Sequence, residues 1–240
     1  MKDQYFTDEH DFFKWDFLED VLDGCPDLQI FTNLTMLTPP DNSREGGRER
    51  FECGGRRREL YDFLRACRHG RRAVAEIRRY FEGKGIVYYG NELLYSCARR
   101  EEYFKRCTQR STEDRAHFFD PDIGLQWGSL PYMRDQGIDK YLFDDSVRGI
   151  AGRSTADSVL IVYQHLQRNR VRSPSDLKER TQRLQQLVNP DFSVYLSNRE
   201  IAFLATTRNA ELRDKLCEVI VAHGDKHALQ YGAWRSGCPT

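Results

Sequence analysis

The stretch Ala116-His117-Phe118-Phe119-Asp120-Pro121-Asp122-Ile123-Gly124-Leu125 decides the fold that we expect for this chain. Its apolar first half is typical of a buried strand, and it runs into an Asp-Pro-Asp turn that a glycine closes. In open α/β sheets, ligands bind at the carboxyl ends of the strands. Because two carboxylates one residue apart are costly to place together without a use, the stretch predicts a binding or catalytic site at that edge of a sheet.

Strands and helices alternate on both sides of this stretch. Apolar and β-branched runs predict strands at 29–37, 85–89, 115–119, 157–164, 192–197 and 200–207, with a short strand in the tail at 229–234. Helical spacing of apolar residues predicts helices at 8–23, 57–68, 71–82, 97–108, 138–152, 173–188 and 209–222. The alternation favours a mostly parallel sheet with right-handed crossovers, closed by a late antiparallel hairpin. We therefore expect one α/β domain over residues 1–240.

Two segments between these elements are predicted to be loops. Residues 42–57 are rich in glycine and arginine and are expected to be exposed, and residues 126–137 contain glycine and proline. On the first helix, the polar residues Asp11, Lys14 and Asp16 are interpreted as solvated charges.

Composition and charge exclude several classes of protein. With 37 basic and 37 acidic residues the formal net charge is zero, so a binder that recognises nucleic acid or membranes by charge alone is not indicated. Residues 44–110 are rich in arginine, and they predict a local basic face for nucleic acid. No stretch reaches the ~20 apolar residues of a membrane span, and an apolar signal region is absent. The 7 cysteines include no C-x-x-C pair and are interpreted as reduced thiols of a cytoplasmic protein, not as a zinc site.

Four strands of the expected sheet end in polar residues. A polar exit from a single strand is common, but four at the same edge of a parallel sheet indicate a ligand site. The four exits are Thr38 to Asn42, Asn91-Glu92, Asp120-Pro121-Asp122, and Gln164-His165 with Arg168.

The two aspartates are open to three uses. They can bind a hard divalent cation such as Mg²⁺ or Mn²⁺, share a proton as a general acid or base, or accept hydrogen bonds from a substrate base or amine. A structural alternative is that Asp122 caps its own turn. His165 can serve as an acid or base, a metal ligand or a phosphate donor, or it can anchor its loop.

Other chemical motifs are absent or interrupted. The chain has no G-x-x-x-x-G-K-[ST], no G-x-S-x-G, and no G-x-G-x-x-G after its first strand, which excludes P-loop NTPases and ordinary α/β-hydrolases and disfavours a dinucleotide site. His223 and His227 have the i, i+4 spacing of a helical metal pair. Because Gly224 is expected to interrupt the helix, no metal site is predicted there.

Five motifs occur along nearly the whole chain. They are Asp11-Phe12-Phe13-Lys14-Trp15-Asp16-Phe17, Met36-Leu37-Thr38-Pro39-Pro40-Asp41, Phe118-Phe119-Asp120-Pro121-Asp122-Ile123-Gly124-Leu125, Lys140-Tyr141, and Tyr163-Gln164-His165-Leu166-Gln167-Arg168. Together they resemble the motifs of a group of bacterial proteins of unknown function that are distantly similar to the class I methyltransferases acting on adenine in large ribosomal RNA.

The resemblance implies a Rossmann-like three-layer sandwich of the class I methyltransferase type, with the Asp-Pro-Asp turn in the place of the catalytic loop after the fourth strand. It implies a group-transfer enzyme that uses S-adenosylmethionine and acts on nucleic acid. In place of a glycine-rich turn after the first strand, this chain has Thr38-Pro39-Pro40-Asp41. The implied roles are catalytic for Asp120, Asp122 and His165, cofactor-binding for Thr38, Asp41 and Glu92, and substrate-binding for Lys14, Lys140, Gln164 and Arg168.

Two alternatives stay open. One is a divalent-metal-dependent nuclease or phosphodiesterase on the same scaffold, in which Asp41, Asp120 and Asp122 gather Mg²⁺ or Mn²⁺. The other is a non-catalytic domain that binds a nucleotide or a partner, with the arginine-rich region 44–110 as its contact surface.

Overall fold

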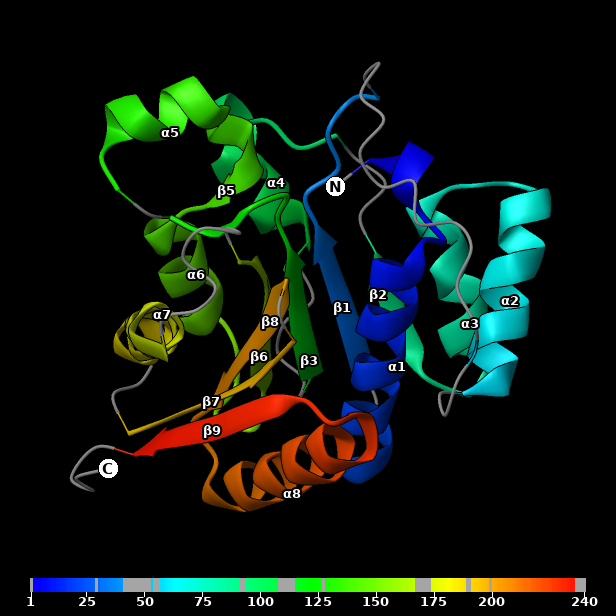
Figure 1. Cartoon of the computed structure of the whole chain (residues 1–240). Coiled ribbons are helices and arrows are strands. Elements are labelled where there is room, and N and C mark those ends of the chain that lie inside the picture. Colours follow the sequence, from blue (N-terminus) through cyan, green and yellow to red (C-terminus); the bar gives the residue numbers. More distant parts are fainter. Residues whose placement is uncertain are drawn as a thin grey trace.

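A seven-stranded mixed sheet with the order β2-β1-β3-β6-β8-β7-β9 forms the centre of the protein (Figure 1). The computed structural model describes residues 2–28, 30–40, 53, 57–90, 94–107, 115–126, 128–166, 174–188, 191–198 and 200–235. The parallel core consists of β2 (Val87–Gly90), β1 (Ile30–Thr35), β3 (Arg115–Asp120) and β6 (Val159–His165). Each remaining strand runs antiparallel to its neighbours, namely β8 (Ile201–Thr207), β7 (Phe192–Ser197) and β9 (Gln230–Arg235). The predicted α/β class, the late hairpin and the tail strand are confirmed.

Helices cover both faces of this sheet (Figure 1). One face carries α1 (Glu9–Gly24), α2 (Arg58–His69), α3 (Ile77–Gly83) and α8 (Ala210–His227), with the 3-10 turns η1 (Asp3–Tyr5) and η2 (Val74–Glu76) nearby in the chain. The other face carries η3 (Cys97–Arg99), α4 (Arg100–Cys107), α6 (Asp144–Ala151) and α7 (Pro174–Val188). Within the described residues, none of these helices is both long and apolar enough to cross a membrane.

The apolar strands supply side chains to two separate cores. In β3, Phe118 joins the core beneath α1, and its neighbour Phe119 joins the core beneath α4 and α6. In β6, Ile161 joins the core beneath α1, and Val162 joins the core beneath α4 and α6. Successive side chains of a strand point to opposite faces, so a strand buried on both faces must be apolar at nearly every position. This explains the uninterrupted apolar runs in the sequence.

The segment after β3 differs from its prediction. Residues 126–137 were predicted to be a loop, but they contain α5 (Leu130–Gln136), which begins where the Ser129 side chain accepts a hydrogen bond from the Tyr132 N–H at 3.4 Å. The helix predicted at 138–152 begins only at Asp144. Before it lie η4 (Ile138–Lys140) and β5 (Tyr141–Leu142), and β5 pairs with β4 (Gly124–Leu125) in a small parallel sheet. This pairing joins residues far apart in sequence, so helical periodicity could not reveal it.

The helix α8 is longer than predicted and continues through Gly224 to His227. The interpretation that this glycine interrupts the helix is wrong. Tyr231 of β9 packs directly on the glycine, and a Cβ added there would lie 2.2 Å from the tyrosine Cδ1. The glycine therefore permits close packing inside a helix, and His223 and His227 stay on one side of α8.

The polar residues of α1 are also placed differently. Asp11, Lys14 and Asp16 were interpreted as solvated charges, but they are 1, 2 and 0% exposed. The helix packs on the sheet and lies beside α2 and α8 (Figure 1), and every side chain from Asp11 to Glu19 is buried. Charges in such a position must be paired, and these are.

The predicted exposed loop at 42–57 falls mostly outside the described residues. Of its two described positions, Cys53 is half-buried, and the Arg57 guanidinium is only 27% exposed because it contacts carboxylates of α1.

A buried histidine of β3 makes the stability of the fold depend on pH. The His117 ring is fully buried, with its Nε2 2.9 Å from the Ser154 Oγ. Burial, together with the charges of Arg115 and Arg153, lowers the pKa of His117 from 6.5 to about 3. Between these values the unfolded chain binds a proton at this position and the folded chain does not. His117 therefore does not reduce the free energy of unfolding above pH 6.5, but it reduces this free energy progressively as the pH falls toward 3.

We expect the variant His117→Asn to show a weaker pH dependence of stability than the wild type. For each pH unit lost between about 6 and 4, the wild type should lose up to ~1.4 kcal/mol more than the variant. Urea unfolding at a series of pH values measures both slopes. His69→Asn is the control, because His69 is exposed at the end of α2. Parallel slopes for wild type and His117→Asn would contradict the lowered pKa.

Candidate functional site

Polar side chains meet at the carboxyl ends of β1, β3 and β6, the edge that the sequence predicted. Thr35 and Asp120 are register partners at the ends of β1 and β3, and the Met36 N–H donates to the Asp120 carbonyl at 3.1 Å. His165 ends β6. Parallel pairing of these strands brings residues distant in sequence to one edge, where ligands bind in folds of this class.

Lys14 lies at the centre of this group. Its Nζ donates to the Asp120 Oδ2 at 2.8 Å and to the Asp11 Oδ1 at 2.9 Å. The same Nζ lies 4.7 Å from the centre of the Tyr163 ring, a distance at which the aromatic face attracts a cation. Thr35 adds a hydroxyl 3.4 Å from the Asp120 Oδ2. A buried ammonium ion is thus shared between two buried carboxylates and an aromatic ring.

The carboxylates outnumber the cation, and this changes their proton affinity. Burial raises the pKa of Asp11 to about 7, a rise that the charge of Lys14 limits and the charges of Asp8 and Asp120 increase. Burial also raises the pKa of Asp8. Although burial lowers the pKa of Lys14, the charges of Asp11 and Asp120 raise it more, so Lys14 stays protonated. Asp11 therefore gains and loses a proton near neutral pH, as a general acid or base requires.

The start of α1 positions Asp11. The Asp8 side chain caps the helix by accepting from the Asp11 N–H at 2.9 Å. The Thr7 N–H donates to the Asp11 Oδ2 at 2.8 Å. Thr7 holds a φ of 82°, which is uncommon for a β-branched residue, and it is fully buried. Backbone strain of this kind gathers at functional sites, where the surrounding structure has to maintain it.

Asp122 lies on the other side of the Asp-Pro-Asp turn. The Thr38 hydroxyl donates to the Asp122 Oδ2 at 3.5 Å, so the exits of β1 and β3 touch. Burial raises the pKa of Asp122, but nearby positive charge, to which Lys2 contributes, lowers it by more, and the net pKa lies below the ordinary value. Asp122 is therefore ionised at neutral pH. Asp11 and Asp122 differ in proton affinity because their neighbours differ.

His165 completes the edge as a neutral ring. Burial lowers its pKa to about 4, with a smaller opposing contribution from Asp120 and smaller lowering contributions from His10 and Lys14. Its ring centre lies 5.0 Å from that of Tyr163 and 6.3 Å from that of His10. A neutral imidazole at neutral pH can accept a proton or a hydrogen bond from a ligand.

Gln164 has a positioning role. Its Oε1 accepts from the Leu125 N–H at 2.9 Å, and its Nε2 donates to the carbonyls of Ile123 and His165, both at 2.8 Å. The side chain is fully buried. This amide, which was predicted to contact substrate, holds the turn that carries Asp122 against the end of β6.

The remaining predicted residues are less connected to this group. Lys140 lies in η4, and its carbonyl accepts from the Ile123 N–H at 2.9 Å, so its backbone adjoins the turn. Three other predicted residues, Asp41, Glu92 and Arg168, lie outside the described residues. The structure thus brings together Lys14, Thr38, Asp120, Asp122, Gln164 and His165.

Sequence reasoning missed three contributors, Asp8, Asp11 and Tyr163, as members of the site. A signal for Asp11 was present, because residues three apart lie on the same side of a helix and Lys14 was already a candidate. Tyr163 lies two residues before His165 in one strand, and side chains at that spacing share a face of the sheet. Asp8 resembled any helix cap and offered no separate signal.

Comparison of the chain with protein-family models, with curated proteins and with solved structures found no match.

Proposed function

We propose that this protein is a group-transfer enzyme of the class I methyltransferase type, dependent on S-adenosylmethionine and acting on nucleic acid. The observation that supports the proposal most directly is the strand order. Antiparallel β8 lies between β6 and β7 beside a parallel core, which is the late antiparallel strand expected of that fold. The Asp-Pro-Asp turn follows β3, the third strand among the described residues rather than the fourth, and it lies next to β1 at the centre of the sheet.

S-adenosylmethionine supplies an electrophilic methyl group when it is bound. The residues of the chain would orient the acceptor and take up the proton that it loses. In our proposal Asp122, which is ionised, accepts a hydrogen bond from the acceptor, and neutral His165 contacts the substrate. Lys14 fixes the orientation of Asp120 and connects it to Asp11, which can hold a proton near neutral pH.

In the described part of the proposed cofactor site, side chains would bind the cofactor in place of backbone N–H groups. Pro39 and Pro40 lack N–H groups, so the backbone after β1 cannot donate hydrogen bonds to a ligand there as a glycine-rich turn would. The carbonyl of Leu37 is occupied, since it accepts from the Tyr95 N–H at 2.6 Å. The Thr38 hydroxyl is the polar group that this exit presents beside Asp122. Side chains at positions 38, 41 and 92 would then hold the cofactor.

The nucleic-acid part of the proposal rests on arginines that follow the predicted loop. Side chains of Arg58, Arg71 and Arg79 are 70, 78 and 74% exposed. Each lies near an acidic neighbour, as Arg58 does near Asp62 at 2.9 Å. Exposed ion pairs of this kind are weak, so a phosphate group can displace the carboxylate.

The structure favours this proposal over a divalent-metal nuclease at the same edge. A metal held by Asp120 and Asp122 would compete with Lys14, whose ammonium ion already lies 2.8 Å from the Asp120 Oδ2. Two cations that close repel each other strongly in a buried site. The third expected ligand, Asp41, lies outside the described residues.

Calorimetric titration tests the proposal, with S-adenosylmethionine and, separately, with Mg²⁺ or Mn²⁺. We expect the cofactor to bind and the methyl group to be transferred to RNA or DNA, with a loss of transfer of at least ~100-fold in Asp122→Asn. Asp145→Asn is the matched control, because Asp145 is exposed on α6 and should leave transfer unchanged. Binding of the metal alone, lost in Asp122→Asn, would instead support the nuclease. If neither ligand binds, the proposal is wrong.

A further inference from the structure

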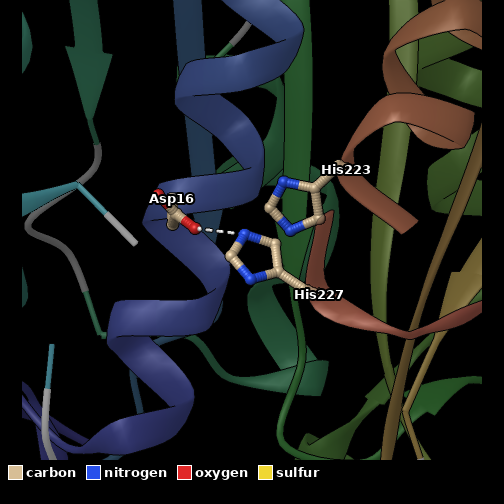
Figure 2. A group of neighbouring side chains, drawn as sticks. All are labelled: Asp16, His223 and His227. Atoms are coloured by element: carbon tan, nitrogen blue, oxygen red, sulfur yellow. Dashed lines mark ion pairs between the residues drawn. The ribbon is translucent and has the colours of Figure 1, made fainter. Parts of the chain in front are cut away.

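Three potential metal ligands meet where α1 and α8 lie against each other. Asp16 projects from α1, and His223 and His227 project toward it from one side of α8 (Figure 2). One ligand-type atom from each residue lies within 4.8 Å of the other two. Asp16 and His223 are 0 and 1% exposed, and the His227 side chain is 9% exposed. Histidines four residues apart on a helix can bind one ion.

Among the described residues, buried atoms of this group that lack a hydrogen-bond partner include the His223 Nε2 and the Asp16 Oδ2. The Asp16 Oδ2 lies 3.4 Å from the His227 Nε2, the ion pair that the dashed line marks in Figure 2. Such atoms are rare in folded proteins, because burial removes their bonds to water. Both belong to residues whose other polar atom is engaged, so the unsatisfied atoms are the ones available to a ligand.

The engaged atoms are held in the way that metal ligands are usually held. The His223 Nδ1 lies 2.6 Å from the Asp20 Oδ2, which fixes the ring and leaves its Nε2 for coordination. The Arg57 N–H donates to the Asp16 Oδ1 at 3.3 Å, which leaves the Oδ2. A carboxylate on the far nitrogen of a ligating histidine orients the ring and raises its basicity. Asp20 and the backbone of Arg57 therefore act as positioning groups.

The charge around the group favours a cation. Arg57 and Lys84 contribute two positive charges, and five carboxylates pair with them, those of Asp16, Glu19, Asp20, Asp23 and Glu59. With both histidines neutral, as ligands must be, the carboxylates outnumber the cations. The rings of two phenylalanines of α1 also pack against His223 and limit access of water; they are Phe13 and Phe17.

We propose that Asp16, His223 and His227 form a binding site for a divalent transition-metal ion, with zinc as its expected occupant. Two imidazoles and one carboxylate suit zinc, whereas Mg²⁺ and Ca²⁺ prefer sites made of oxygen alone. The Asp16 Oδ2 and the His227 Nε2 are 3.4 Å apart. In a tetrahedral site with bonds of ~2.0–2.1 Å, neighbouring ligand atoms are ~3.3 Å apart. Water would take the fourth position.

The site is separate from the group at the carboxyl edge of the sheet. Lys14 and Asp16 are two residues apart in α1, so their side chains leave the helix about 200° apart. A bound ion would connect α1 to α8, elements at opposite ends of the described chain. The proposal does not depend on the proposed function, since metal content and stability test it without any measurement of transfer.

The experiment starts from protein stripped of metal with a chelator and titrated with zinc. We expect one zinc per chain and, at concentrations a hundredfold above the dissociation constant, a melting temperature higher by roughly 5–10 °C. His227→Gln and Asp16→Asn should each weaken zinc binding by more than about 100-fold. Asp20→Asn should weaken it by about 10- to 100-fold, as loss of a positioning carboxylate does. His69→Gln is the control and should bind zinc as the wild type does.

Less than one-tenth of an equivalent of zinc bound to the wild type would overturn the proposal, as would unchanged affinity in both His227→Gln and Asp16→Asn. Circular dichroism of the metal-free variants establishes that each one folds. If a variant does not fold, Co²⁺ added to the wild type decides. Strong visible absorption of a four-coordinate ion supports the site, and the weak spectrum of hydrated Co²⁺ overturns it.

Discussion

Replacement of Lys14 by methionine is expected to lower the free energy of unfolding by about 3–5 kcal/mol. Methionine keeps the length of the side chain but removes the charge that Asp11 and Asp120 share. The Asp120 carboxylate then loses its counter-ion inside the protein, while Asp11, whose pKa Lys14 no longer limits, is held as the neutral acid that burial favours. A buried charge without a partner is among the most destabilising changes known for single residues. Urea unfolding of the purified variant measures the loss.

A second variant separates this effect from loss of packing. In Lys14→Met combined with Asp120→Asn, a neutral amide replaces the carboxylate that lost its counter-ion, so part of the stability should return. Lys215→Met is the matched control, because Lys215 pairs with Asp27 in an exposed salt bridge and should change stability little. If Lys14→Met were as mild as Lys215→Met, the buried charge group would not exist as described.

Gly124→Ala is expected to destabilise the protein by about 2–4 kcal/mol. Gly124 has a φ of 132°, which L-residues rarely adopt, and a Cβ there would lie 2.1 Å from the Gln164 amide. That amide cannot rotate away without losing its bonds to Leu125, Ile123 and His165. The turn that carries Asp122 should shift with it. Thermal unfolding gives the stability change, and any transfer activity should fall in parallel.

The same substitution at Gly149 should have the opposite sign. Gly149 lies within α6, and an added Cβ would meet nothing closer than the Arg153 Nη1 at 3.7 Å. Alanine is favoured over glycine inside a helix by roughly 0.5–1 kcal/mol, so Gly149→Ala should be slightly stabilising. Equal effects at the two positions would show that the conformation of Gly124 is not what limits substitution there.

Local patterns predicted the sheet and its edge because both depend on short-range periodicity. The apolar run of β6 and the Asp-Pro-Asp turn after β3 are visible in the sequence, and parallel strands must end at a common edge. The sequence therefore predicted that Thr38, Asp120 and His165 lie at that edge.

Contacts between distant segments could not be predicted in this way. The burial of Lys14 depends on its ion pair with Asp120, which lies 106 residues away in the sequence. This pairing allows a charged side chain of the helix to lie in the interior. Gly224 was interpreted as a helix breaker because the local pattern does not show that Tyr231 of β9 packs on this position of α8. In both cases tertiary packing overrode a local propensity, and the histidine pair of α8 was dismissed for that reason.

The link between α1 and α8 has a consequence for folding during synthesis. Asp20 and its partner His223 are separated by 203 residues, so α1 leaves the ribosome long before α8 does. Until the later segments are made, Phe13 and Phe17 of α1 lack Phe203 and His223, the rings against which they pack in the folded protein. Domains generally fold as units, and such partly covered intermediates are prone to aggregate. Docking of α8 onto α1 should therefore be a late step of folding, and the nascent chain is prone to aggregate until it occurs.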